Sequence, residues 1–210
     1  MQSSVRSIYN KGLLYSWFAA MHTRVDILLY GKPEEELRCV IAVIFDALHQ
    51  LEMTANFFEP SSELGQLNQT AHLKPIAVSP ELFRMISLCR IYHEKTEGRF
   101  DIAIRSDRYD SQTFQSLILD ETHSTVYFAK QGLRLDLSGF LKGYALDRVK
   151  EILQTHSIEN TLVNIGNSSI TAIGNHPNGE GWKVTVASTK KEYLLKNECL
   201  TTSGNDSPGR

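Results

Sequence analysis

Cysteine is scarce in this sequence, and the cysteines present are not arranged in pairs. There are three in 210 residues, Cys39, Cys89 and Cys199, and they are far apart and form no C-x-x-C motif. An odd number of widely spaced thiols supports neither a disulfide framework nor a zinc site. Each cysteine is therefore expected to be a small buried hydrophobic residue.

Long apolar segments are also missing. No run of about 18 apolar residues occurs, so no membrane span is expected. The apolar run 13–21, which follows Arg6 and Lys11, has some features of a signal peptide. Ser16 interrupts it, however, and strand-like residues follow directly. The chain is predicted to be cytoplasmic, or exported with the signal absent from this sequence.

Neither sign of charge dominates. The 22 Lys and Arg against 24 Asp and Glu leave a net charge of −2, and 41% of residues are hydrophobic, as in an ordinary soluble globular protein. No nucleic acid partner is expected, because recognition of nucleic acid by charge requires a basic surface. The seven histidines show no metal-ligand spacing such as H-x-x-x-H. None is assigned a catalytic role, and the catalytic residues stay unknown.

What the sequence does contain is regular patterning along its whole length. A chain of 210 residues suits one large domain or two small ones, and residues 1–210 are interpreted as a single domain. Helical patterns come early, one helix lies between hairpins, and strands dominate the end. This order predicts an α+β fold with a mostly antiparallel sheet and three main helices.

The first half predicts two strands and two helices. The strands lie within residues 14–30 and meet near Met21 and Thr23. A helix begins after Pro33, and its apolar face has i, i+3, i+4 spacing, with Leu37, Val40, Ile41, Ile44, Phe45, Leu48 and Leu51. Residues 57–68 are interpreted as a loop with about one helical turn. A second helix begins at Ser79-Pro80-Glu81 and is expected to bury Leu82, Met85, Ile86, Cys89 and Tyr92.

The second half is predicted to be richer in strands. Residues 100–104 are interpreted as a short extended segment and residues 105–116 as a surface loop. Strands 125–130 and 133–137 are predicted to form a hairpin around Gln131-Gly132. A third helix covers roughly residues 140–154, and strands follow at 161–165, 169–173, 182–187, 193–195 and 200–203.

The stretch Leu133 to Asp147 carries the clearest functional signal. Alternating leucines predict a half-buried strand that passes through Ser138-Gly139 into a helix. Free N–H groups at such a junction, two glycines and the charge of Lys142 favour a bound phosphate. The alternative is that Ser138 only caps the helix and Lys142 is solvated. A short glycine motif alone does not decide between them.

Six segments together resemble the ApbE family of flavin transferases, the FAD:protein FMN transferases. They occur in the family's order and cover nearly the whole chain. They are Met21-His22-Thr23, residues 62–68 (SELGQLN), residues 98–101 (GRFD), residues 136–147 (DLSGFLKGYALD), residues 162–166 (LVNIG) and Thr202-Ser203-Gly204.

The resemblance implies an enzyme that binds FAD as substrate, uses Mg²⁺ to polarise its pyrophosphate, and transfers FMN to a Thr or Ser hydroxyl of an acceptor protein with release of AMP. Positioning and charge neutralisation are the main catalytic requirements of phosphoryl transfer. The residues that the resemblance assigns to the nucleotide are Met21, Phe58, Arg99, Phe100, Asp101, Asp136 and Lys142. The backbone carbonyl of Gly139 is assigned to the metal.

The sequence also departs from the family pattern. His22 replaces a usual glycine, Ile102-Ala103 stand where Pro-Thr is common, and residues 166–169 (GNSS) replace Gly-Gly-Asp. The pattern continues past Thr202-Ser203-Gly204 with metal-binding carboxylates, whereas this sequence ends at Arg210. Three interpretations stay open: a shortened form of a working transferase, a non-catalytic flavin-nucleotide-binding or scaffolding relative, and a structural domain without a ligand.

Overall fold

The chain forms two compact units. The computed structural model describes residues 4–186 and 189–202. The first unit combines the chain up to His49 with the chain from Ala145 onward, and the second unit is Gln50–Tyr144. The boundaries fall within two long helices, α1 (Glu34–Ala55) and α4 (Ser138–Thr155). The interpretation of residues 1–210 as a single domain stays a prediction.

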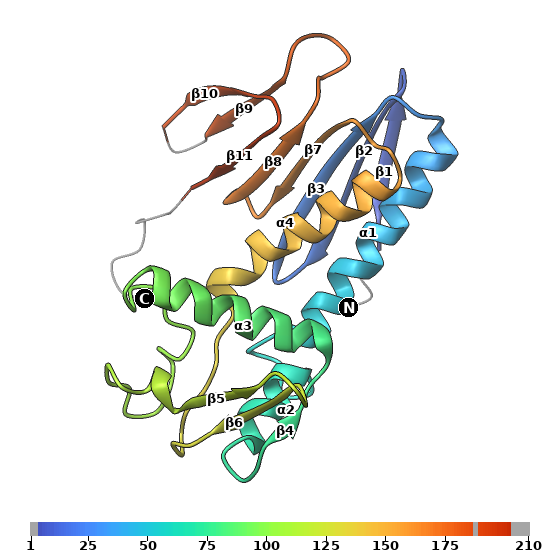
Figure 1. Ribbon diagram of the computed structural model, residues 1–210. Helices are drawn as coiled ribbons and strands as arrows, with labels where there is room; N and C mark the ends of the chain where they lie inside the picture. The colour runs from blue at the N-terminus through green and yellow to red at the C-terminus, as the bar shows by residue number, and fades with distance from the viewer. Residues whose placement is uncertain (1–3, 187–188, 203–210) are drawn as a thin grey trace. The chain divides into compact units, whose positions relative to one another are not determined.

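A six-stranded antiparallel sheet forms the centre of the first unit (Figure 1). Its spatial order is β1-β2-β3-β7-β8-β11, and every neighbouring pair runs antiparallel. The strands are β1 (Arg6–Asn10), β2 (Leu13–Ala20), β3 (Thr23–Tyr30), β7 (Asn160–Ile165), β8 (Ser169–Ile173) and β11 (Glu198–Thr201).

One face of this sheet is covered by helices. The register pairs Phe18 with Val25 and Val25 with Ile165, so these buried side chains lie on a common face. From α1, Phe45 packs edge-on against Phe18, with ring centroids 5.1 Å apart. From α4, Lys150 Nζ lies 3.1 Å from Cys199 Sγ on β11. Both helices therefore cover the same side of the sheet, as Figure 1 shows.

A two-stranded hairpin packs against the opposite face. It consists of β9 (Trp182–Val186) and β10 (Lys191–Leu195). Trp182 is almost fully buried against Ile170 and Ala172 of β8, and its indole N–H donates to the carbonyl of Ile173 at 2.9 Å. Burying a tryptophan with its polar atom satisfied is a strong local stabilisation. The first unit is thus layered as helices, sheet and hairpin.

The second unit is built around two helices and a small sheet. Its helices are α2 (Glu63–Thr70) and α3 (Pro80–Lys95), and the short 3-10 helix η1 spans Phe114–Ser116. The strands β4 (Ile76–Ala77), β6 (Thr125–Phe128) and β5 (Leu117–Asp120) form an antiparallel sheet in that order. Ser79 caps α3 by accepting from the N–H of Leu82 at 3.2 Å, and Pro80 occupies the first turn.

The α+β class and most elements agree with the sequence prediction. The two strands before residue 30, the helix after Pro33, the helix starting at Pro80 and the strands of residues 160–173 are confirmed. The predicted strands after residue 180 are also confirmed where the structure describes them. Ala187 and Ser203, which were included in two of these strands, lie outside the described residues.

Five local predictions are wrong. Residues 63–70 form a helix of eight residues rather than one turn, and residues 100–104 form turns rather than an extended segment. The partner of β6 is β5, which the sequence patterning missed, and residues 133–137 pair with neither. Tyr92 is 44% exposed and not in the core. Of the cysteines only Cys89 is buried, which raises the pKa of its thiol to about 12, whereas Cys39 and Cys199 are exposed.

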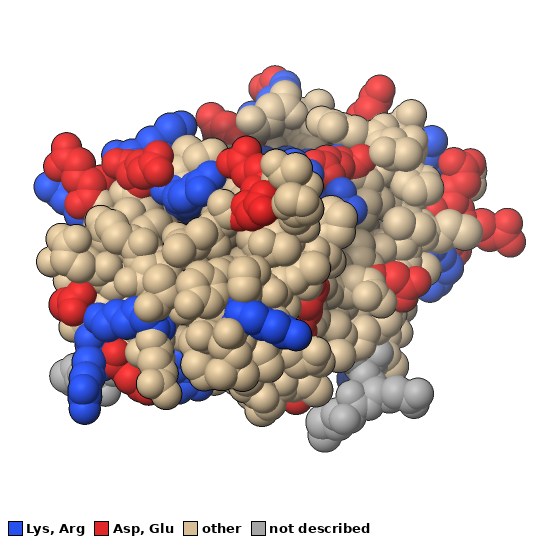
Figure 2. Space-filling model, turned by 60° about the horizontal axis from the view of Figure 1, so that its bottom comes forward, with Lys and Arg blue, Asp and Glu red and all other residues tan. Residues whose placement is uncertain are grey.

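Charges of both signs are mixed on the surface. Figure 2 shows one face on which Lys and Arg side chains alternate with Asp and Glu side chains around broad uncharged areas. This pattern agrees with the sequence charge of −2. Over residues 4–186 and 189–202, none of the helices combines the length and the apolar character needed to cross a bilayer.

Candidate functional site

The backbone of the stretch before α4 is held by Asn68, by the Ser106 hydroxyl and by the carbonyl of Ile102, which accepts from the N–H of Asp136 at 2.7 Å. Asn68 of α2 accepts a hydrogen bond from the backbone N–H of Leu135 at 2.8 Å and donates one to its carbonyl at 3.0 Å. Leu133, Leu135 and Leu137 are buried, as the alternation predicted. The segment is therefore half-buried without belonging to a sheet, because two side chains and one loop carbonyl supply the hydrogen bonds that a neighbouring strand would make.

Asp136 connects this segment to the start of α4. Its Oδ1 accepts from the backbone N–H of Ser138 at 2.8 Å and from the Ser138 hydroxyl at 2.5 Å. Its Oδ2 lies 2.7 Å from Nε of Arg105, and its side chain is only 8% exposed. The carboxylate does not face water, and it, rather than Ser138, provides the capping acceptor at this helix start.

Arg105, which pairs with Asp136, also contacts two aromatic rings. Its guanidinium carbon lies 5.6 Å from the ring centroid of Phe57 and 5.7 Å from that of Phe58. The two rings pack edge-on at 5.3 Å, and Phe58 is 59% exposed. One guanidinium therefore brings two predicted nucleotide contacts, Phe58 and Asp136, into one cluster by cation–π and ionic contacts. Sequence patterning placed Arg105 in a surface loop and missed this role.

Two glycines lie on one side of the first turns of α4. Gly139 and Gly143 are four residues apart, which places them on the same helix face. Neither has a positive φ, and a Cβ added to either would meet no atom of residues 4–186 or 189–202 within 4 Å. Internal packing and backbone conformation therefore do not require glycine here, although glycine weakens a helix. Open space at this face is compatible with close approach of a ligand.

The predicted contacts Arg99, Phe100 and Asp101 follow the end of α3. Asp101 accepts from the N–H of Ala103 at 2.7 Å and from the Tyr109 hydroxyl at 2.8 Å, and its side chain is 5% exposed. These contacts raise the pKa of Tyr109, chiefly through the hydrogen bond to Asp101. Asp101 thus holds its own loop together, whereas Arg99 is exposed.

Phe100 belongs to a group of four aromatic side chains. Tyr92 of α3 lies 6.3 Å from Phe100 and 6.1 Å from Phe140 between ring centroids, and Phe140 lies 5.3 Å from Tyr144. Phe140 follows Gly139 directly. The rings therefore connect two predicted contact segments, residues 99–101 and 139–143, that are far apart in the sequence.

The remaining predicted contacts lie elsewhere. Lys142 is a partly buried residue of α4. Met21 is in the first unit, in the two-residue turn that joins β2 to β3, and is 8% exposed. Met21 and His22 have φ angles of 52° and 56°, the left-handed conformation that two-residue hairpin turns require and that glycine adopts most readily.

Comparison with known proteins assigns the chain to a family. The profile of the ApbE family matches residues 21–207. The chain belongs to the ApbE family. The match extends over both units and includes the six segments from which the resemblance was inferred.

Individual ApbE relatives are similar at moderate identity. FAD:protein FMN transferase of Chlamydia muridarum is 30% identical over 77% of this chain and 56% of its own length, and that of Chlamydia trachomatis is 29% identical over the same shares. The protein of the same name from Klebsiella pneumoniae is 25% identical over 73% of this chain. The chain spans about half the length of the curated relatives it matches.

Solved ApbE structures have the same fold. The flavin transferase ApbE from Vibrio cholerae superposes with a TM-score of 0.76 at 20% identity, covering 99% of this chain and 74% of the other. The ApbE protein from Thermotoga maritima gives a TM-score of 0.75 at 20% identity, covering 97% and 71%. The predicted ApbE-like α+β fold is confirmed.

The described residues do not form a magnesium site by themselves. Mg²⁺ takes an octahedral set of oxygen ligands that includes carboxylates. Over residues 4–186 and 189–202, no group of three or more His, Cys, Asp and Glu side chains is arranged to hold a metal. Both oxygens of Asp136 are engaged, by Ser138 and Arg105. The carbonyl of Gly139 stays a predicted ligand, and no step below is routed through the ion.

The nucleotide-binding assignments as a set also stay predictions. In the second unit, Phe58 and Asp136 share the Arg105 cluster, and Phe100 is connected through Tyr92 to Phe140 in the first turn of α4. The residues that sequence reasoning missed are Arg105, Phe57 and Asn68. Asn68 was within a quoted motif, but neither spacing nor composition indicates that its amide binds a segment 67 residues later.

Proposed function

We propose that this chain is an FAD:protein FMN transferase. The observation that carries the proposal is the ApbE match over residues 21–207, together with curated relatives that bear this name. In the reaction, a Thr or Ser hydroxyl of an acceptor protein attacks the FMN phosphorus of FAD. The pyrophosphate bond breaks, AMP leaves, a phosphoester forms, and the hydroxyl proton passes to solvent or to a base.

The pyrophosphate is proposed to lie at the start of α4. At the start of α4 the N–H of Ser138 is bonded to Asp136, and those of Phe140 and Leu141 are bonded to the carbonyl of Leu137, so the N–H of Gly139 is the group proposed to meet the anion. Gly139 and Gly143 leave this face open, and Lys142 adds a positive charge to the same turn. Arg105 neutralises Asp136, so this carboxylate need not repel the phosphates. Neutralisation and positioning of this kind are the main contributions of a protein to phosphoryl transfer.

The ring-bearing ends of FAD are proposed to contact the residues assigned by the resemblance. Phe58 and Asp136 would contact one part of the nucleotide, Arg99 to Asp101 would line its adenosine side, and Met21 and Lys142 complete the set. Dependence on Mg²⁺, with the Gly139 carbonyl as one ligand, is part of the proposal. When bound, the ion would supply charge neutralisation at the phosphates.

The activity is tested with FAD, MgCl₂ and a panel of peptides that each contain one Thr or Ser. Mass spectrometry should show a peptide heavier by FMN less one water, and AMP should appear in equal amount. Asp136→Asn should reduce the rate at least tenfold, whereas Asp120→Asn, which alters an exposed carboxylate paired with His123, should not. EDTA should abolish transfer. If FAD binds but none of the peptides gains mass, the proposed transferase activity would be contradicted.

A second candidate is a flavin-nucleotide-binding relative without transfer activity. It is favoured by the three contacts that the Asp136 carboxylate makes within the protein, two at Oδ1 and one at Oδ2, which occupy most of its acceptor positions. This candidate predicts that FAD binds with a measurable heat in isothermal titration whether or not Mg²⁺ is present. Absence of any heat at high FAD concentration would count against both candidates.

A further inference from the structure

His93 is a largely buried histidine in the last turn of α3, and it is not among the predicted nucleotide contacts. Its side chain is 14% exposed. The ring lies parallel to that of Phe114 in η1, with centroids 3.7 Å apart and 6° between the planes. Phe114 is itself 7% exposed, so the imidazole is packed against the interior of the second unit. Stacking on a buried ring fixes the plane of the imidazole.

One nitrogen of this ring binds the loop that follows α3. Nδ1 of His93 lies 2.9 Å from the backbone carbonyl oxygen of Phe100. A carbonyl oxygen only accepts, so Nδ1 carries a hydrogen and donates it, in the neutral and in the protonated ring alike. The N–H of Phe100 is held as well, because it donates to Oγ1 of Thr96 at 3.0 Å. Both polar backbone groups of Phe100 are therefore bound by side chains from the end of α3.

The loop connects His93 to the start of α4. Oδ2 of Asp101 lies 4.0 Å from Nδ1 of His93, and the Asp101 side chain is 5% exposed. One residue further on, the carbonyl of Ile102 accepts from the N–H of Asp136 at 2.7 Å. Residues 100–102 therefore join the end of α3 to the segment that leads into α4, and both of these segments contain predicted nucleotide contacts.

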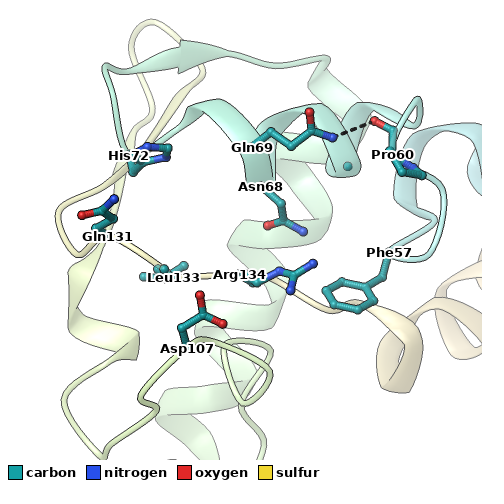
Figure 3. A pocket seen from close by; sticks show the side chains of 11 residues that line it. Phe57, Pro60, Asn68, Gln69, His72, Asp107, Gln131, Leu133 and Arg134 are labelled. Atoms are coloured by element: carbon teal, nitrogen blue, oxygen red, sulfur yellow. Dashed lines mark hydrogen bonds between the residues drawn. The ribbon is translucent and has the colours of Figure 1, made fainter.

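The far end of the loop is held without His93. Oγ of Ser106 accepts from the N–H of Arg134 at 2.9 Å, and the N–H of Asp107 donates to the carbonyl of Gly132 at 2.8 Å. Asp107, Gly132 and Arg134 line a cavity of about 370 Å³ beside α2, which Figure 3 shows. The predicted nucleotide contacts, all of which the structure describes, do not line this cavity. Loss of the histidine should therefore release only the end of the loop next to α3.

We propose that His93 positions residues 99–101 for the adenosine side of FAD by holding the carbonyl of Phe100. The inference rests on the proposed function and adds to it a residue that the family resemblance does not assign. A loop that is already in place loses less entropy when the nucleotide binds. His93 acts through the loop and not on the reacting phosphate, so its contribution is the same in the ground state and in the transition state. Its loss should raise the KM for FAD and leave kcat unchanged.

Three variants separate the hydrogen bond of His93 from its stacking. His93→Asn keeps a donor at the place of Nδ1 but has no ring, His93→Phe keeps the ring on Phe114 but has no donor, and the amide of His93→Gln reaches the place of Nε2 instead. AMP is the probe, because it carries only the adenosine side of FAD. Titration calorimetry should show AMP binding weakened about tenfold in His93→Phe and His93→Gln, and within about threefold of the wild type in His93→Asn.

Two further measurements separate positioning from a general loss of structure. Thermal melts establish that each variant is folded, and riboflavin, which lacks the adenosine side, should bind to all of them with wild-type affinity. In the transfer assay, His93→Phe should raise the KM for FAD about tenfold and change kcat by less than about twofold. His49→Phe is the matched control, because the His49 ring is also parallel to a phenylalanine, Phe45, with centroids 6.2 Å apart, but belongs to the first unit.

Wild-type AMP affinity in folded His93→Phe or His93→Gln would overturn the positioning role and leave the proposed function intact. Equal weakening of AMP binding in His93→Asn and His93→Phe would also overturn it, because the hydrogen bond would then not be the cause. So would a parallel loss of riboflavin affinity, which would mean that His93 only supports the fold of the second unit. If the wild type bound neither AMP nor FAD, the proposed function itself would be rejected.

Discussion

Two aspartates in the second unit each bind two neighbouring groups. Asp136 accepts from Ser138 and binds Arg105, and Asp101 accepts from Ala103 and Tyr109. Each carboxylate fixes its own loop and also orients a second side chain. Because both are nearly buried, their partners are part of the folded structure and not only of a ligand site.

Tyr109 should make stability depend on alkaline pH. Its hydrogen bond to Asp101 raises the tyrosine pKa above the ordinary value of 10.0, so the folded state favours the protonated phenol. The contribution is present below about pH 10 and is lost as the pH rises through the folded pKa. Tyr109→Phe should therefore lower the free energy of unfolding by about 1 kcal/mol at pH 7. Between about pH 9 and 11 the variant should lose less stability than the wild type, because it lacks the phenol that titrates there. Urea unfolding at several pH values measures this, and parallel curves for both proteins would refute it.

At the scale of elements, the start of α4 is organised for something other than helix stability. Two glycines occupy adjacent turns of one face where an alanine would fit without a clash. The preceding segment is held by Asn68 rather than by a sheet. Local rules that are broken without a packing reason commonly mark functional positions.

Alanine at these glycines should separate stability from binding. Gly139→Ala and Gly143→Ala should each stabilise the protein by up to about 1 kcal/mol, because alanine favours the helix. The added methyl groups should weaken FAD binding at least tenfold if the pyrophosphate lies against this face. Denaturant melts and titration calorimetry measure the two effects. Gly179→Ala, also in open space, is the control. Stabilised variants with unchanged FAD affinity would show that the glycines do not face the nucleotide.

Asn68 should be the most sensitive polar residue of α2. Asn68→Ala leaves a backbone N–H and a carbonyl of Leu135 without their partners and should cost about 1–3 kcal/mol. Asn68→Asp can accept but not donate, so it should restore only part of this loss. Gln66→Ala, an exposed change on the same helix, should have a much smaller effect. Equal unfolding midpoints for Asn68→Ala and Gln66→Ala would contradict this account.

At the scale of the whole molecule, the two units differ in how they are built. The first unit has a continuous antiparallel sheet with helices on one face and a hairpin on the other. The second has short strands and loops joined by side-chain hydrogen bonds and cation–π contacts. Most predicted nucleotide contacts lie in this second unit, as is common for sites carried by loops.

Binding of FAD should stabilise the whole folded chain. A ligand that binds only the folded state at 100 times its dissociation constant adds about 2.7 kcal/mol to the free energy of unfolding. The melting temperature should therefore rise with FAD concentration in differential scanning calorimetry, and AMP alone should produce a smaller rise. A melting temperature independent of FAD would exclude flavin nucleotide binding by the folded protein.

The periodic parts of the fold were predictable, and the irregular parts were not. The helix after Pro33 and the strands β7 and β8 follow from apolar spacing, because one face of each is buried. Residues 133–137 have the alternation of a strand yet pair with no strand, since Asn68, Ser106 and the carbonyl of Ile102 bond to their backbone. Alternation reports which side chains are buried and not which group supplies the hydrogen bonds.

The candidate site also combines features that the sequence predicts with features that it does not. The sequence by itself determined the family, the α+β class and the glycine-flanked turn that leads into α4, because these depend on local spacing and ordered motifs. Only the tertiary structure decided that Arg105 binds Asp136 and lies over the ring of Phe58, and that Asp107 and Arg134 line one cavity. Such contacts join loops that are distant in the chain, and their geometry is set by the packing of the elements that carry them.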